Sequence, residues 1–147
     1  MIHLATQRPD WYKYALMLAE TASKRSEDPY MKVGAVVVRK DNSVASIGYN
    51  GAPPGVKIDW SDRDKRRKFV IHAEINALRY IHKSDSEGGF IAITHRPCSA
   101  CLPVIAAHGI VHVVYSQPID TMTYDPGTLD EIAETLGIRV RRIEGVH

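Results

Sequence analysis

Two short motifs near the middle of the chain carry the residue types that could perform chemistry. The first is His72-Ala73-Glu74, and the second, Pro97-Cys98-Ser99-Ala100-Cys101, follows about one expected strand later. Together they supply one imidazole and two thiols, which are ligands that zinc prefers. Three protein ligands leave the fourth position of a tetrahedral ion open for water, as in a catalytic zinc site.

The spacing of these residues suits a single ion. Cys98 and Cys101 lie at i and i+3 in the first turn of an expected helix (98–108), so both sulfurs can reach one metal. The free amides and positive dipole end of that turn favour thiolates. His72 begins a second expected helix and completes the ligand set. Because zinc lowers the pKa of bound water, Glu74 is the expected proton carrier.

Two other interpretations of the cysteines stay open at this point. A C-x-x-C motif between a strand and a helix is also typical of thioredoxin-type redox pairs. A structural zinc site is the second alternative, but it would need a fourth protein ligand. We favour catalytic zinc because both motifs occur together, each at an expected strand-to-helix junction.

The elements that must position these motifs alternate between helices and strands. Apolar periodicity predicts a helix over about 9–24, and a hairpin of strands 33–38 and 44–49 turns at Asp41-Asn42. Residues 59–68 form a polar stretch, residues 117–126 form an irregular loop, and Thr128 with Glu131 predicts a capping box. Further helices are expected from 72, over 98–108 and after 128, with strands at 90–94, 111–115 and 138–143. This order predicts one α/β domain over 1–147, with a sheet of about five strands.

Composition and charge restrict the class of partner. The 147 residues are 44% hydrophobic and 24% charged, which is normal for a soluble globular domain. A net charge of +2 implies no strong attraction to nucleic acid or membranes. The basic run 63–68 contains an acid and lacks interleaved aromatic residues, so we interpret it as a solvated face. Without a recognisable signal peptide or bilayer-spanning run, we expect a cytoplasmic protein.

In its short motifs, the sequence resembles the deoxycytidylate (dCMP) deaminases of the cytidine deaminase-like superfamily. H-x-E followed by P-C-x-x-C is the established signature of zinc nucleobase deaminases. Gly48-Tyr49-Asn50-Gly51 and its proline-rich extension narrow the resemblance to dCMP deaminases. The resemblance implies a three-layer α/β/α sandwich with a mixed sheet, conversion of dCMP to dUMP, and a homohexamer. Matching stretches cover most of the chain up to Tyr115: 25–29, 32–38, 48–55, 72–77 and 94–101.

The same resemblance implies a role for individual residues. His72, Cys98 and Cys101 would bind one zinc ion per chain, and Glu74 would shuttle protons. The other implied contacts concern the substrate: Asn50 with the deoxyribose, the Ala73 amide with the pyrimidine carbonyl, and Arg25 and Ser26 with the 5′-phosphate.

Control by nucleotides is also implied by the family. Many members are activated by dCTP and inhibited by dTTP, and Gly48, Tyr49 and Gly51 belong to the motif associated with that control. Mg²⁺ could accompany such a nucleotide effector. His95 and Tyr124 are expected to line or cover the substrate pocket.

In the implied reaction, water activated by zinc attacks C4 of cytosine while Glu74 protonates N3, and ammonia then leaves. A tRNA adenosine deaminase shares both zinc motifs and is the nearest alternative. The small net charge, the expected C-terminal strand and Tyr49-Asn50-Gly51 argue against it. A non-catalytic module, in which zinc only braces a nucleotide-binding domain, is the other alternative. Such a module would have no use for the unligated carboxylate of Glu74.

Overall fold

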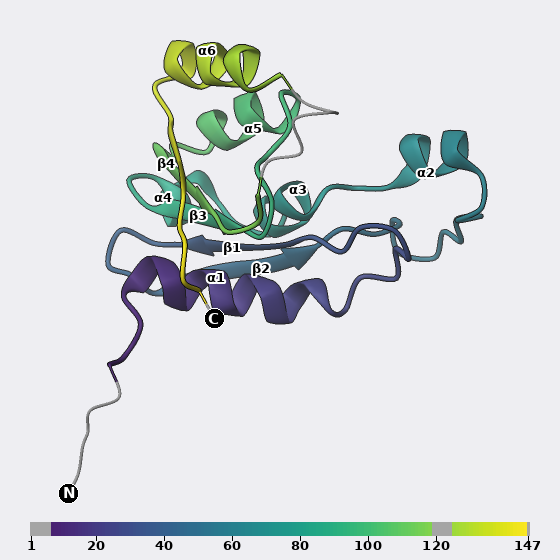
Figure 1. Ribbon diagram of the computed structural model, residues 1–147, viewed down its shortest axis with the longest axis horizontal. Helices are drawn as coiled ribbons and strands as arrows, with labels where there is room; N and C mark the ends of the chain where they lie inside the picture. Colours follow the sequence, from purple (N-terminus) through teal and green to yellow (C-terminus); the bar gives the residue numbers. More distant parts are fainter. Residues whose placement is uncertain (1–6, 119–124, 147) are drawn as a thin grey trace, which may run out of the picture.

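The computed structural model describes residues 7–118 and 125–146, and its centre is a five-stranded sheet (Figure 1). The strand order is β2-β1-β3-β4-β5. β1 pairs antiparallel with β2 and β3, whereas β3–β4 and β4–β5 are parallel, so the sheet is mixed. The strands span Gly34–Val38 (β1), Val44–Tyr49 (β2), Phe90–Ile93 (β3), His112–Tyr115 (β4) and Arg139–Arg142 (β5).

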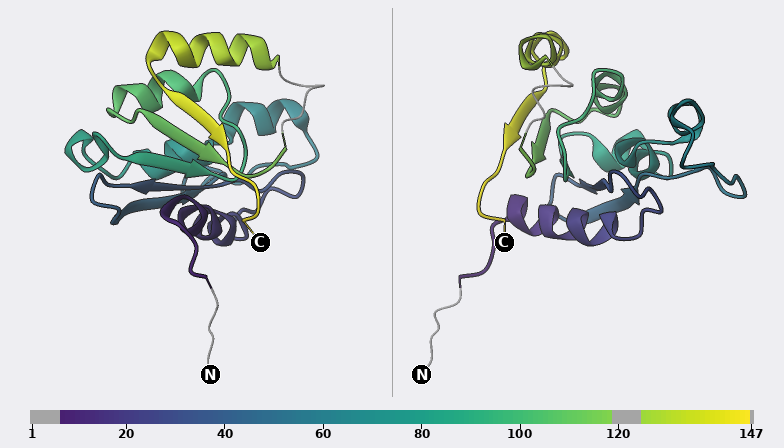
Figure 2. Two further views of the ribbon diagram at one scale, coloured as in Figure 1. Left: turned by 60° about the vertical axis from the view of Figure 1, so that its left-hand side comes forward. Right: turned by 45° about the vertical axis from the view of Figure 1, so that its right-hand side comes forward.

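Helices cover both faces of this sheet, which confirms the expected α/β/α sandwich (Figure 2). Helix α1 (Trp11–Ser23) packs on one face, where Leu16 and Val36 belong to the same core cluster. On the other face lie α3 (Ala73–Leu78), α5 (Cys101–Ala107) and α6 (Pro126–Leu136). All five residues of β1 are buried, because helices cover both faces of the sheet. Successive side chains alternate across the strand, so Val36 and Val37 face opposite layers.

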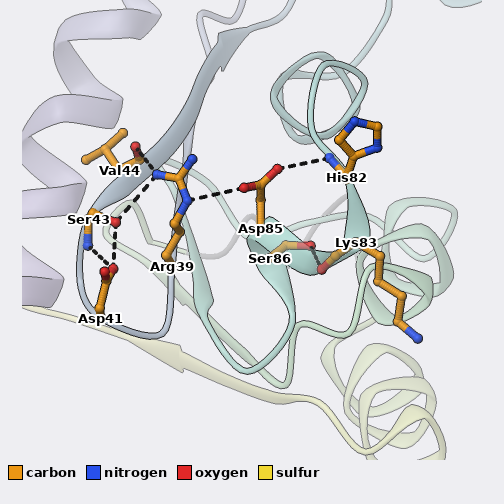
Figure 3. Close-up of polar contacts among 8 residues, drawn as sticks. All are labelled: Arg39, Asp41, Ser43, Val44, His82, Lys83, Asp85 and Ser86. Atoms are coloured by element: carbon orange, nitrogen blue, oxygen red, sulfur yellow. Dashed lines mark hydrogen bonds and ion pairs between the residues drawn. The ribbon is translucent and has the colours of Figure 1, made fainter.

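The β1–β2 hairpin is tied to the rest of the fold by Arg39 (Figure 3). Its turn contains Asn42 at φ 72°, a conformation that asparagine tolerates better than most residues. The Arg39 guanidinium donates to the Val44 carbonyl at 2.9 Å and to Asp85 at 3.3 Å. Asp85 belongs to the short helix α4 (Lys83–Ser86), so this contact joins the hairpin to the segment that leads into β3.

Part of the polar stretch 59–68 forms a helix that the sequence did not predict. Helix α2 (Arg63–Phe69) begins after Asp62, whose carboxylate accepts from the amides of Asp64 and Lys65. Every residue of α2 is at least partly exposed, and Figure 1 shows it standing away from the sheet. Its cap and its basic last turn support the helix locally, in the absence of a buried apolar stripe.

Two predicted helix starts were wrong. Helix α5 begins at Cys101 instead of Cys98, and the Cys98 carbonyl accepts from the amides of Cys101 and Leu102. The capping box at Thr128 does not form. Asp125 caps α6 instead, accepting from the Gly127 amide and the Thr128 hydroxyl, because Pro126 is well suited to the first helical position.

Within the two described segments, every helix falls short of the length and hydrophobicity that crossing a bilayer requires. Tyr124 and most of the expected loop 117–126 lie outside these segments.

Candidate active site

The three expected metal ligands meet where α3 and α5 begin. Nδ1 of His72 lies 3.2 Å from Sγ of Cys101 and 3.5 Å from Sγ of Cys98, and the two sulfurs are 3.4 Å apart. In a tetrahedral zinc site, bond lengths of about 2.0–2.3 Å place such ligand atoms roughly 3.6–3.8 Å apart. The observed separations are within a few tenths of an ångström of these values, so the ligand set fits one zinc ion.

His72 is held in place by backbone pairing just before α3. Ile71 exchanges two hydrogen bonds with Gly51, at 2.8 and 3.1 Å, in an isolated bridge. The expected strand before His72 is therefore only this single bridge. His72 itself is extended, and the helix begins at the next residue, Ala73. This pairing fixes the imidazole at the N-terminus of α3, opposite Cys98 and Cys101 at the start of α5.

The two cysteines differ in protonation before any metal binds. The hydrogen bond between the sulfurs lowers the pKa of Cys98 to about 4, and the hydrogen bond to His72 adds to that effect. The same sulfur–sulfur hydrogen bond, together with burial, raises the pKa of Cys101. The pair thus shares one proton at neutral pH. A divalent cation can replace that proton, because metal binding favours deprotonated sulfur.

Glu74 lies two residues beyond His72, in the first turn of α3. Its side chain is almost entirely enclosed, with 4% of the residue exposed. Burial raises the pKa of this carboxyl above its usual value, and the nearby Cys98 adds to the shift. A carboxyl whose pKa moves toward neutrality can both accept and donate a proton under working conditions.

A cavity of about 170 Å³ opens beside the ligands and Glu74. Asn50 is fixed in its wall, since its side chain accepts from the Val33 amide and donates to the Met31 carbonyl. His95 also lines the cavity, and burial lowers the pKa of its imidazole. The complete wall consists of Asp28, Met31, Val33, Asn50, Val70, His72, Ala73, Glu74, His95, Arg96 and Cys98.

The other expected site residues lie elsewhere. Arg25, Gly48, Tyr49 and Gly51 line a second cavity of about 460 Å³, together with residues that include Arg79 and Tyr80. The Arg25 guanidinium lies 6.0 Å from the centre of the Tyr49 ring. Ser26 is buried and donates its hydroxyl to the Asn50 carbonyl at 2.8 Å. Neither expected phosphate ligand, Arg25 or Ser26, belongs to the wall of the first cavity.

Three consecutive residues separate the two cavities. Tyr49 and Gly51 face the larger cavity, and Asn50 between them faces the smaller one. This alternation is that of an extended chain, whose successive side chains point to opposite sides.

Several lining residues were not anticipated from the sequence. Arg96 and Asp28 line the cavity beside the metal ligands, and Asn76, Arg79 and Tyr80 line the second one. The position of Arg96 directly before Pro97-Cys98 was the available signal for the first site. Arg79 and Tyr80 follow α3 and carry no comparable signal.

Known proteins are similar to this chain in sequence and in fold. Residues 9–117 match the family model of the cytidine and deoxycytidylate deaminase zinc-binding region. The deoxycytidylate deaminase of Mycobacterium phage D29 is 43% identical over 125 residues, which cover 74% of this chain and 95% of that protein. Human deoxycytidylate deaminase is 32% identical over 114 residues, covering 72% of this chain and 64% of the human protein.

A solved structure agrees with these sequence matches. The dCMP deaminase of cyanophage S-TIM5, in complex with dCMP and dUMP, superimposes with a TM-score of 0.72 at 28% identity. The superposition covers 94% of this chain and all of that one. Because the family model matches residues 9–117 and the phage relative is 43% identical, the chain belongs to the cytidine and deoxycytidylate deaminase zinc-binding family.

Proposed function

We propose that the protein hydrolyses dCMP to dUMP and ammonia with one zinc ion held by His72, Cys98 and Cys101. The observation that carries this proposal is the buried Glu74 in the wall of the cavity that His72 and Cys98 also line. The relatives named deoxycytidylate deaminase support the choice of dCMP. A structural metal site would need neither an adjoining cavity nor a buried, unligated carboxyl.

When bound, zinc would supply a water molecule of lowered pKa as the nucleophile. Glu74 takes one proton from that water and delivers it to N3 of cytosine as the oxygen bonds to C4. Glu74 then transfers the remaining hydroxyl proton to the amino nitrogen, the C4–N bond breaks, and ammonia leaves. The balance is dCMP plus water giving dUMP plus ammonia, and the raised pKa of Glu74 suits both transfers.

Two residues in the wall would orient the nucleotide. Ala73 is the first residue of α3, so its amide has no helical acceptor and can donate to the pyrimidine carbonyl. Asn50 is locked by its contacts to Val33 and Met31, and its Nδ2 also donates to Asp28 at 3.4 Å. The remaining lone pair of its Oδ1 can accept a hydrogen bond from a deoxyribose hydroxyl.

The second cavity suits the nucleotide effector that the family resemblance implies. It combines Arg25 and Arg79 with the rings of Tyr49 and Tyr80, which is a suitable lining for a phosphate chain and a base. We therefore propose dCTP activation and dTTP inhibition through this cavity. Mg²⁺ with the effector, assembly as a homohexamer and a cytoplasmic location remain predictions.

The direct test is ammonia release from dCMP, CMP, dCTP and deoxycytidine, each with and without added dCTP or dTTP. Incubation with tRNA, followed by analysis for inosine, covers the adenosine deaminase alternative. We expect the highest rate with dCMP and a rate dependent on zinc. Zinc bound at one ion per chain, with no ammonia from any cytosine compound, would contradict the proposal.

A further inference from the structure

The active-site cavity has one permanent cation among the described residues of its wall. Asp28 and Glu74 are acids, and His72 belongs to the metal ligand set. Burial holds the pKa of His95 below its usual value, which favours the neutral imidazole. Arg96 is the remaining charged residue of the wall, and it is a cation.

Arg96 is buried to an unusual degree for an arginine. Its side chain is 9% exposed, and its Nη2 donates to Asp130 on α6. Asp130 is 70% exposed, so water reaches the carboxylate of this ion pair. The Nε of Arg96 is buried and has no hydrogen-bond partner in the described part of the chain.

A buried N–H without an acceptor is costly, and native structures contain few of them. The ion pair with Asp130 accounts for Nη2 but leaves Nε unexplained. Because Arg96 lines the substrate cavity, a substrate that brings an acceptor to its guanidinium would supply the missing partner. Phosphate is well suited to that role, since arginine forms strong charge-assisted hydrogen bonds with phosphate oxygens.

We propose that Arg96 recognises the 5′-phosphate of the nucleotide through its Nε–H, and so selects nucleotide over nucleoside. The inference rests on the proposed function, because it concerns the same cavity and substrate class. Arg25, the cation expected for this task, lines the other cavity. Arg96 stands two residues before Cys98, so phosphate recognition is built into the loop that carries a metal ligand.

The test compares nucleotide and nucleoside in four proteins: wild type, Arg96→Gln, Arg96→Lys and Asp130→Ala. Calorimetry measures binding of dUMP and deoxyuridine, and kcat/KM is measured for dCMP and deoxycytidine. We expect Arg96→Gln to weaken dUMP binding by roughly tenfold to a hundredfold, as for loss of a charged hydrogen bond. Deoxyuridine binding should change less than about twofold. Arg96→Lys keeps the charge without the Nε–H and should be intermediate.

Asp130→Ala is the matched control for a purely structural role. It removes the ion pair at an exposed helical position but leaves the guanidinium in the wall. Because it removes a competing negative charge, we expect dUMP to bind this variant as tightly as wild type or more tightly.

Three results would overturn the proposal. One is an equal loss of dUMP and deoxyuridine affinity in Arg96→Gln, and another is the same loss in Asp130→Ala. The third result applies if Arg96→Gln does not fold. In that case the proposal is overturned if Arg96→Lys prefers dUMP to deoxyuridine by the same factor as the wild type. Failure of the proposed function would look different, since the wild type itself would then release no ammonia from dCMP.

Discussion

Replacing Gly48 by alanine should displace the helix that carries Glu74. Gly48 lies on β2 directly beneath α3, and a Cβ there would come within 2.5 Å of the Ala77 amide nitrogen. The Ala73 carbonyl oxygen and the Ala77 Cα would be 2.8 and 2.9 Å away. All three atoms are backbone, so no side-chain rotation can relieve the contact. Ordinary van der Waals contact begins near 3.4 Å. To relieve the 2.5 Å contact, α3 would have to move by about 0.9 Å.

Both stability and turnover should suffer. Overpacking of this kind costs about 1–3 kcal/mol of unfolding free energy. A shift of about 1 Å in a catalytic group can lower the rate roughly a hundredfold. Urea unfolding followed by circular dichroism measures the first effect, and kcat for dCMP measures the second.

Gly51→Ala is the matched control from the same motif. A Cβ at Gly51 would meet only a side-chain oxygen of Glu27, at 3.9 Å, so this variant should fold with nearly wild-type stability. If Gly48→Ala unfolds at the wild-type urea concentration and keeps its kcat, the close approach of α3 to β2 does not position Glu74. An equal loss in Gly51→Ala would also refute the reasoning.

Three further predictions follow from the site and the core. Glu74→Gln should keep zinc and fold but lose at least about a hundredfold in kcat, and near-normal ammonia release would rule out the assigned proton carrier. Cys98→Ser should no longer hold zinc at one ion per chain, so full occupancy by elemental analysis would refute the ligand set. Burial, with Arg139 and Arg141 nearby, lowers the pKa of His112, which contacts the Tyr12 hydroxyl at 3.2 Å. Since the unfolded chain then binds the extra proton more readily, unfolding free energy should fall as pH drops below about 6.5. In His112→Gln that part of the pH dependence in urea titrations should vanish, and an unchanged slope would contradict the assignment.

The sheet and the metal ligands were predictable because their signals are local. Short apolar, β-branched runs between turn residues mark the strands, and β2 spans the residues expected for it. The spacing of Cys98 and Cys101 by itself indicates a shared ion. Helix α2 escaped prediction because it buries no apolar face, so no periodicity marks it.

The substrate contacts were harder to predict, because residue type does not determine direction. Arg25 and Ser26 are neighbours in sequence, yet Arg25 lines the larger cavity, whereas the Ser26 hydroxyl donates a hydrogen bond to the Asn50 carbonyl. Arg96 shows the opposite case. Its ion pair joins it to Asp130 on α6, more than thirty residues away in the chain, and its Nε is buried without a partner among the described residues. Such long-range contacts leave no trace in a local pattern.

The shared wall at Tyr49, Asn50 and Gly51 has a consequence for how the two cavities behave. The three residues are joined by two planar peptide units, so a backbone displacement at Tyr49 or Gly51 acts on Asn50 through a short covalent link. Asn50 in turn holds the loop at Met31 and the start of β1 at Val33. A ligand that displaces this backbone from one hollow would therefore also act on the wall of the other.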